Sequence, residues 1–222
     1  MGHFEPRVEE LLVGDVRPSL RYLSELRPVM MEPPERPMDG EIAYYMYRGV
    51  KTYEDLRYDI TVLPYRRLGR EHVKTFGHYH NRASNGRPYP EIYEVISGKA
   101  VFVLQKPAGP VIEDLIVVEV HEGESILVPP GYGHVTVNPG EGTLIYANLV
   151  CKLVRGDYSL FRRMRGAAVY LTVFGTLKNP MYSQVPAPRN ADELVIKKSL
   201  ADMAEDPRIR EFLRNPSDEP PF

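Results

Sequence analysis

Two histidines, His78 and His80, stand two residues apart within the run Thr75–Gly98. In a β-strand, side chains at positions i and i+2 point to the same face, so these two imidazoles can reach one ion. Glu91 follows eleven residues after His80 and could add a carboxylate. Two imidazoles alone form a weak metal site, and a bare pair is more often a structural or surface feature. The hypothesis of a metal site therefore depends on further ligands elsewhere in the chain.

A third imidazole comes from a separate segment that carries its own turn residues. The order along this segment is Gly123, Pro129, Gly131, His134 and Asn138. The glycine and proline turn before His134 sets the start of a strand, so that the imidazole can point into a barrel. Three imidazoles and one carboxylate suit a borderline divalent ion such as iron, manganese, nickel or zinc. Such a ligand set can leave coordination positions open for a substrate or water.

The strand after the first two histidines offers two carboxylates, Glu91 and Glu94. Alternation with a period of two places Glu91 and Tyr93 on one face of the strand and Glu94 on the other. The spacing to Gly98 favours Glu91 as the ligand. Tyr93 would then lie beside the ion.

The elements that must position these residues are short strands between residues 41 and 150. Apolar and aromatic runs alternate there with turns rich in Gly and Pro, which is typical of a sandwich or barrel. The predicted strands are Ile42–Tyr47, Tyr58–Pro64, Val73–His80, Glu91–Ser97, Lys99–Gln105, Val111–Val120, Ser125–Val128, His134–Asn138 and Thr143–Val150. We expect Lys99–Gln105 to run on from Gly98 as the return strand of a hairpin.

The flanks of this region have a different character. Val8–Val13 could form a short helix or an arm, and Ser19–Leu26 shows a helix-like apolar period. Near the other end, Asp206 followed by Pro207 is typical of a helix start. The predicted C-terminal elements are a strand at Tyr170–Phe174 and helices at Ser199–Glu205 and Pro207–Arg214, with Ile209, Phe212 and Leu213 on the apolar face. We expect one domain with an N-terminal arm (1–40), a barrel (41–175) and a C-terminal extension with short helices (176–222).

Composition argues against several classes of function. The 222 residues carry a formal net charge of -2 with a pI near 6.3, so we expect no nucleic-acid partner. The single cysteine, Cys151, excludes an internal disulfide and favours a reducing compartment. The N-terminus lacks an apolar signal-peptide run, and no apolar run approaches the roughly 18 residues of a membrane span. We therefore expect a soluble, cytoplasmic protein with no membrane partner.

Both histidine segments resemble the sequence motifs of cupins. The segment from Gly123 to Asn138 fits the second cupin motif at every position. The first segment fits the H-x-H and E-x6-G parts of the first motif, but His72 replaces a glycine and the gap between histidine and glutamate is longer. Cupins are small jelly-roll barrels. The resemblance therefore implies an all-β fold, the cupin double-stranded β-helix.

Two further residue pairs sharpen this resemblance. Thr75-x-Gly77 precedes the histidines, and Glu91-x-Tyr93 follows the polar loop NRASNGRPYP. In this order the segments are similar to the cupin-type phosphoglucose isomerase family of archaea. The similarity covers roughly residues 19–158.

That family interconverts glucose 6-phosphate and fructose 6-phosphate, a step of glycolysis and gluconeogenesis, as a homodimer with a divalent metal. The resemblance implies one ion per subunit, with Fe2+ preferred and Mn2+, Ni2+ or Zn2+ as alternatives. The implied metal ligands are His78, His80, Glu91 and His134. The implied substrate-binding residues are Thr61, Thr75, Gly77, Tyr44 and Tyr158.

Roles within the implied site follow the family pattern. Thr61 and Thr75 resemble phosphate contacts, and Gly77 would allow close approach of the backbone. Glu91 is the candidate base that moves a proton between C1 and C2, with Tyr93 as a helper. A metal-assisted hydride shift would need no base, and the sequence leaves both routes open. Each residue also has a plain structural interpretation, since threonine is common in strands and a glycine can mark a bulge.

The chain departs from the family after the last barrel strand, where the family has a tyrosine and a histidine near the substrate. Val150 and Gly156 stand there in this sequence, and Tyr158 lies just beyond. Basic residues that could substitute at the phosphate end are Lys152, Arg155, Arg82 and Arg87.

Two other classes of function share the same motifs. An iron-dependent cupin dioxygenase would use the same ligands with dioxygen. A non-enzymatic sugar-binding or storage cupin is the third alternative. The intact ligands of this chain argue against it, because storage cupins can lose these ligands without harm.

Overall fold

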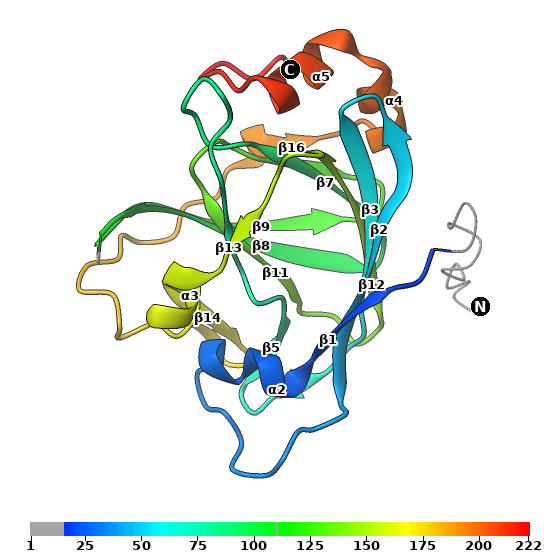
Figure 1. Cartoon of the computed structure of the whole chain (residues 1–222). Helices are drawn as coiled ribbons and strands as arrows, with labels where there is room; N and C mark the ends of the chain where they lie inside the picture. The colour runs from blue at the N-terminus through cyan, green and yellow to red at the C-terminus, as the bar shows by residue number, and fades with distance from the viewer. Residues whose placement is uncertain (1–15, 110) are drawn as a thin grey trace.

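The computed structural model describes residues 16–109 and 111–222, so the helix or arm predicted at Val8–Val13 lies outside the described residues. Two large antiparallel sheets curl towards each other and enclose the core between them (Figure 1). This arrangement is the all-β cupin barrel that the sequence predicts.

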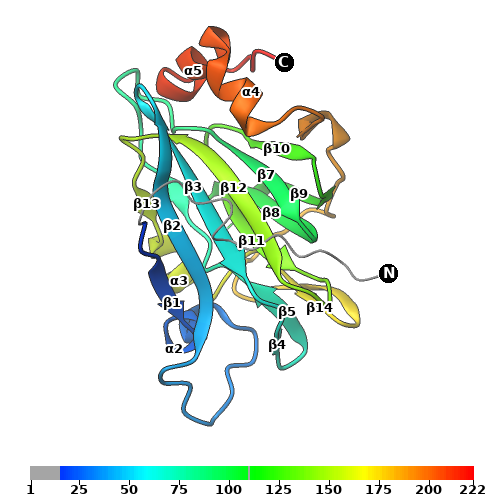
Figure 2. The same cartoon turned by 90° about the vertical axis from the view of Figure 1, so that its right-hand side faces the viewer.

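The first sheet contains the strand that carries Glu91. Its strands, in spatial order, are β1 (Ser19–Tyr22), β2 (Ile42–Tyr53), β3 (Leu56–Leu63), β12 (Leu144–Cys151), β7 (Glu91–Ser97), β10 (Ser125–Val128) and β16 (Val195–Ile196). The central strand β12 pairs with β3 on one side and with β7 on the other (Figure 2). Every residue of β12 is buried, which explains why its sequence, apart from Asn148, is apolar without alternation.

The second sheet contains the strand that carries His134. Its strands, in spatial order, are β15 (Gly175–Lys178), β14 (Val169–Thr172), β5 (Glu71–Lys74), β11 (Gly133–Asn138), β8 (Lys99–Ala108) and β9 (Val111–His121), with β4 (Arg67–Leu68) also paired to β5. A separate short ladder joins β6 (Tyr79–His80) to β13 (Gly156–Asp157).

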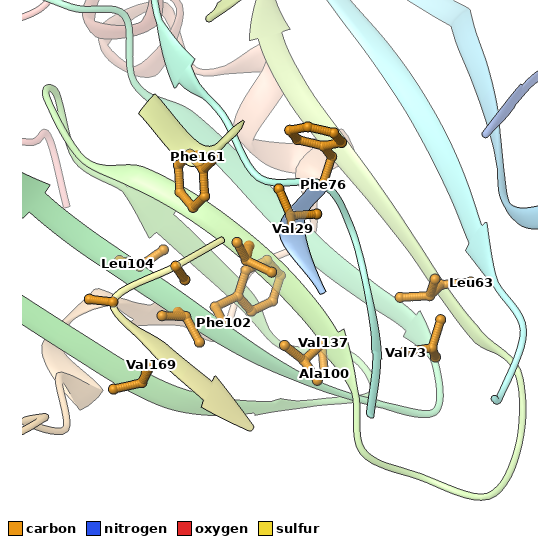
Figure 3. Packing of buried hydrophobic residues seen from close by; sticks show 14 of the residues in the cluster. Val29, Leu63, Val73, Phe76, Ala100, Phe102, Leu104, Val137, Phe161 and Val169 are labelled. Carbon is orange, nitrogen blue, oxygen red and sulfur yellow. The ribbon is translucent and has the colours of Figure 1, made fainter. Parts of the chain in front are cut away.

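Apolar side chains from both sheets fill the space between them. Phe102 and Leu104 of β8 belong to the same buried cluster as Val137 of β11 and Leu63 of β3 (Figure 3). Phe102 and Leu104 have no exposed surface. Burial of such side chains is the main favourable term that holds the two sheets together.

The bounds predicted for β7 and β10 agree with the structure, but the predicted hairpin after β7 is wrong. β7 pairs with β12 and β10, whereas β8 pairs with β11 and β9 in the facing sheet. Gly98, with φ of +90°, turns the chain from one sheet into the other. Two strands joined by one residue therefore belong to different layers.

The helix predicted at Ser19–Leu26 is wrong for its first half. Residues 19–22 form β1, which pairs with β2, and Leu23–Leu26 alone forms the one-turn helix α2. The Glu25 carboxylate accepts the backbone N–H of Tyr22 at 2.8 Å and fixes the start of this turn. Pairing with the edge of β2 overrides the local helical period.

The strand predicted at Val73–His80 is interrupted. An irregular stretch separates β5 from β6, and within it Gly77 has φ of +83°. The backbone of His78 still pairs with that of His134, through N···O distances of 3.3 and 3.1 Å. The two histidines are thus held near β11 without lying on one continuous strand.

Two helices, α4 (Leu200–Glu205) and α5 (Pro207–Arg214), confirm the C-terminal prediction and lie across one end of the barrel (Figure 1). The predicted helix start is observed, because the Asp206 carboxylate accepts the backbone N–H of Arg208 at 2.9 Å. The apolar residues of α5 are buried, namely Ile209, Phe212 and Leu213.

The segment between β13 and α4 adds elements that the sequence did not reveal. Helix α3 (Ser159–Arg163) follows β13 directly, and β14 corresponds to the strand predicted at Tyr170–Phe174.

No helix among residues 16–109 and 111–222 has the length and apolar character needed to cross a membrane. The limits predicted for the arm, barrel and extension stay a prediction.

Candidate active site

Four side chains predicted as metal ligands converge inside the barrel. The ligand atoms of His78, His80, Glu91 and His134 all lie within 4.8 Å of one another. The Nε2 atoms of His78 and His80 are 3.2 Å apart. Glu91 Oε2 is 3.2 Å from Nε2 of His80 and 3.3 Å from Nε2 of His134. Residues from three separate segments thus meet at one point.

Backbone pairing from three elements holds this cluster. Glu91 begins β7, where it pairs with Val128 of β10. His134 lies on β11 and pairs with Leu104 of β8. His80 pairs with Gly156 through the β6–β13 ladder. Each ligand is therefore fixed by the fold rather than by a flexible loop.

Hydrogen bonds set the orientation of the ligand atoms. The Nδ1 atom of His80 lies 2.9 Å from the backbone oxygen of Tyr89. A carbonyl oxygen can only accept, so Nδ1 carries the proton and Nε2 presents a lone pair to the cluster. The hydroxyl of Tyr93 donates to Glu91 Oε2 at 2.8 Å and lies 2.9 Å from Nε2 of His134.

Burial controls the charge of this cluster. It lowers the pKa of His78 well below its usual value, and it also lowers the pKa of His134. Burial would raise the pKa of Glu91, but its close contacts with the imidazoles of His134 and His80 outweigh burial and hold this pKa well below the usual value. Burial raises the pKa of Tyr93, so its hydroxyl stays protonated. Neutral imidazoles around a carboxylate are the protonation states that metal binding requires.

The donor set fits a divalent ion. The lone pair of His80 Nε2 faces the carboxylate oxygen of Glu91 at 3.2 Å, a contact between two acceptors that is favourable only with a proton or a cation between them. Three imidazole nitrogens and one carboxylate oxygen match the preferences of iron, manganese, nickel and zinc.

The ligand cluster forms part of the wall of a cavity of about 260 Å³. The structure places every residue predicted for the site on this wall. They are Tyr44, Thr61, Thr75, Gly77, His78, His80, Glu91, Tyr93, His134 and Tyr158. The cavity therefore joins the ligands, the threonines and the tyrosines, which lie far apart in the sequence.

Gly77 occupies a position where a side chain cannot fit. A Cβ atom there would lie 2.6 Å from Val135 Cγ2 and 2.7 Å from the ring of Phe161. Its positive φ also belongs to the left-handed region that favours glycine. The chain thus passes between the barrel wall and α3 only because this residue has no side chain.

Sequence reasoning missed several polar residues on the cavity wall. Arg57 and Asp59 line the cavity together with Thr61, as do Tyr146 and Asn148 of β12. Arg57, Asp59 and Thr61 are spaced two apart on β3, so they share one face of the strand. Because Thr61 was predicted for the site, the same period of two along the strand was the signal that could have identified Asp59 and Arg57.

Asp59 stands out among these residues because it is a buried carboxylate. Its Oδ1 atom accepts the backbone N–H of Gly49 at 2.7 Å, and its Oδ2 atom accepts from Arg57 Nε at 2.9 Å. Burial raises the pKa of Asp59 despite the neighbouring guanidinium. This pair fixes the side chain of Arg57 at the edge of the cavity.

One of the basic residues considered for the phosphate end does line the cavity, namely Arg155. Lys152 bonds instead to the backbone oxygen of Glu54. The other two candidates are also engaged away from the cavity wall: Arg82 donates to the Gly86 backbone oxygen and Arg87 pairs with Asp218. Arg48 lines the cavity too and was not predicted.

Comparison with known sequences identifies the family. The sequence pattern of the family "Glucose-6-phosphate isomerase (GPI)" matches residues 22–187, which is most of the chain. The chain belongs to this family. The matched region contains the ligand cluster and the whole cavity wall described above.

Curated relatives of the isomerase family are similar to this chain at modest identity. The glucose-6-phosphate isomerase of Thermococcus litoralis is 26% identical over 66% of this chain and 76% of that protein. Those of Thermococcus onnurineus and Pyrococcus abyssi are 37% and 32% identical, each over 56% of this chain and 61% of the relative. The chain thus spans about three fifths of the length of the latter two relatives.

Similarity to solved structures is confined to part of this chain. CapF, the capsular polysaccharide assembling protein of Staphylococcus aureus, is 16% identical over 48% of this chain and 27% of CapF, with a TM-score of 0.37. A vicilin from Solanum melongena is 12% identical over 52% of this chain and 29% of the vicilin, with a TM-score of 0.38. Likeness at this level has no bearing on the activity.

Proposed function

We propose that this protein interconverts glucose 6-phosphate and fructose 6-phosphate with a divalent metal bound by His78, His80, Glu91 and His134. One observation carries the proposal. The convergent ligands and a wall rich in hydroxyl groups share a single cavity within the region that matches the isomerase family. A bound divalent ion would polarise the C1 and C2 oxygens of the sugar and stabilise negative charge on them.

The residues of the chain divide the remaining work. Thr61 and Thr75 offer hydroxyl groups and Gly77 offers backbone on the cavity wall, which suits a phosphate group. The oxygen of Thr75 accepts the backbone N–H of Thr136 at 3.1 Å, and this bond fixes the side chain. Tyr44 and Tyr158 cover the sides of the cavity and exclude water from the sugar.

Transfer of hydrogen between C1 and C2 is assigned to Glu91, with Tyr93 as its helper. The Tyr93 hydroxyl donates to Glu91 and so orients the carboxylate. Proton transfer through Glu91 and a direct hydride shift make opposite predictions in heavy water. Uptake of solvent deuterium at C2 of the sugar supports proton transfer, whereas complete retention of the substrate hydrogen over many turnovers would overturn it.

Other features of the proposal come from the family resemblance. Fe2+ is the proposed native metal, and a cytoplasmic homodimer is the proposed form of the enzyme in glycolysis and gluconeogenesis. Elemental analysis of the purified protein and light scattering would test the metal and the dimer.

A coupled assay with metal add-back tests the activity itself. Fructose 6-phosphate is supplied, and formation of glucose 6-phosphate is followed through a dehydrogenase. We expect activity as purified, loss after treatment with a chelator, and recovery with Fe2+, Mn2+, Ni2+ or Zn2+. Absence of activity with all four ions would overturn the isomerase proposal.

A further inference from the structure

The loop between the second and third proposed ligands is long and internally bonded. It covers residues 81–90, between His80 and Glu91. The Ala83 N–H donates to the Arg87 backbone oxygen at 2.8 Å, and the Asn85 side chain accepts the Arg87 N–H at 3.0 Å. These bonds give the loop a defined tip at residues 83–87.

The C-terminal tail forms hydrogen bonds and an ion pair with this tip. The Asn85 amide donates to the side chain of Asn215 at 2.7 Å and to the backbone oxygen of Pro216 at 2.9 Å. The Arg87 guanidinium makes two bonds to the carboxylate of Asp218, one of them at 2.7 Å. Segments about 130 positions apart in the chain are therefore joined by side-chain contacts.

The tail itself is anchored to the body of the protein. It follows α5, whose apolar face packs in the same buried cluster as Ala83 and Tyr89 of the loop. The ring of the last residue, Phe222, lies edge-on to Phe212 of α5 with centroids 6.5 Å apart. The loop tip is thus held from a rigid part of the fold.

The base of the loop contacts a proposed ligand directly. The backbone oxygen of Tyr89 accepts from His80 Nδ1, as described above, and the Tyr89 N–H donates to the Asn81 oxygen at 3.1 Å. Tyr89 is buried, with 5% of its surface exposed. A shift of the loop would therefore move the carbonyl that orients the imidazole of His80.

We propose that the C-terminal tail, residues 215–218, is a clamp that positions the loop at 81–90 and through it the His80 ligand. The residues match the isomerase family only up to position 187, so the clamp lies outside the shared region. The inference rests on the proposed metal site. It makes Asn85, Arg87 and Asp218 positioning residues that contact neither metal nor substrate.

The expected size of the effect follows from exposure. The side chains of Arg87 and Asp218 are 43% and 80% exposed, and exposed ion pairs contribute little individually. Loss of the clamp should therefore loosen the loop without unfolding the barrel. We expect a weakening of metal binding of about two- to fivefold, the range of an exposed pair expressed as an affinity.

The test compares Asp218→Asn and the double variant Asn215→Ala/Asp218→Asn, whose changes both lie in the tail, with a matched control. The control is Glu32→Gln, which weakens the similarly exposed pair between Glu32 and Arg70 in another part of the fold. The first readout is hydrogen exchange of residues 81–90 in the metal-free protein. The second is the dissociation constant for Mn2+ alone, measured by competition with a coloured chelator.

We expect exchange in the loop to become at least about threefold faster in the clamp variants and to stay unchanged in Glu32→Gln. Unchanged exchange would overturn the clamp. Faster exchange with unchanged Mn2+ affinity would overturn its positioning role. The charge-swapped pair Arg87→Asp/Asp218→Arg should restore both readouts relative to Arg87→Asp alone.

Failure of the proposed function has a different signature. If the unaltered chain does not bind Mn2+ or the other divalent ions, the metal proposal fails. Hydrogen exchange in the metal-free protein would still decide whether the tail holds the loop.

Discussion

The two ends of the cavity are built on different principles. At the closed end, Glu91 and His134 are 4% and 2% exposed, and they bond to each other and to Tyr93. At the open end, Arg48 and Arg155 are exposed side chains on the rim. The first end is a dense network in which each group depends on its neighbours.

This difference suggests that the closed end carries out the chemical step and that the open end binds the substrate from solution. Buried polar groups interact strongly because water does not screen them, so loss of one leaves the others without partners. Charges at a rim attract an anion from solution, but water and salt screen each contribution. We therefore expect changes at the closed end to abolish turnover and changes at the rim to alter the affinity for the substrate.

The largest expected effect is that of Glu91→Gln. The variant keeps the shape of the side chain but removes the negative charge that the ion and the proton transfer require. We expect turnover to fall by about 10²–10⁴-fold, the usual contribution of a general base, while the fold persists. Steady-state kinetics and circular dichroism measure the two quantities.

Glu94→Gln is the matched control for this variant. Glu94 lies on the opposite face of β7 and accepts the backbone N–H of Leu200 at 2.8 Å, a bond that an amide oxygen can also accept. Near-normal turnover is expected here. Full activity in Glu91→Gln would mean that the closed end is not the catalytic end.

A smaller effect concerns the stability of the metal-free protein at mildly acidic pH. Burial lowers the pKa of His78 and of His134, so below about pH 6.5 the unfolded chain binds more protons than the folded chain. The free energy of unfolding should therefore fall as the pH drops through 6.5. Each histidine can contribute a slope of at most about 1.4 kcal/mol per pH unit.

Urea denaturation after chelation, at several pH values between 7.5 and 5.5, measures this slope. The variant His78→Gln removes one of the two titrating groups and should give a shallower pH dependence. Parallel curves for the variant and the unaltered chain would show that the closed end is not the source of the acid sensitivity.

The convergence of the four candidate ligands at the closed end was also predicted from the sequence, whereas their roles stay a prediction. His78, His80, Glu91 and His134 carry motif spacing, and the choice of Glu91 over Glu94 followed from the spacing of Glu91 to Gly98. Both depend on local geometry, which a sequence records directly. The strand β7 was predicted with its observed bounds for the same reason.

The features that the sequence could not show are those that depend on which strands pair with each other. The residue Gly98 separates β7 from β8, and nothing local distinguishes a hairpin turn from a crossing between sheets. Likewise, Ser19–Tyr22 became a strand because the edge of β2 was available to it. The rim residues Arg48 and Arg57 needed both the strand faces and the curvature of the barrel before they could be assigned to the cavity.

The smallest expected effect tests the rim through Arg155→Ala. The backbone of Arg155 is fixed on both sides by Asn81, through bonds of 2.7 and 3.2 Å, so removal of the side chain should leave the β6–β13 ladder in place. We expect KM for fructose 6-phosphate to rise by about three- to tenfold with kcat nearly unchanged, because an exposed cation aids binding of substrate and transition state equally.

Added salt should shrink this difference, since the Debye length falls to about 3 Å at 1 M ionic strength. Lys152→Ala is the matched control, because this neighbouring cation bonds to the Glu54 oxygen away from the cavity wall. A fall in kcat with an unchanged KM in Arg155→Ala would instead place this guanidinium in the chemical step. The contrast between a chemical end and a capturing rim would then fail at Arg155, whose neighbour Gly156 pairs with His80.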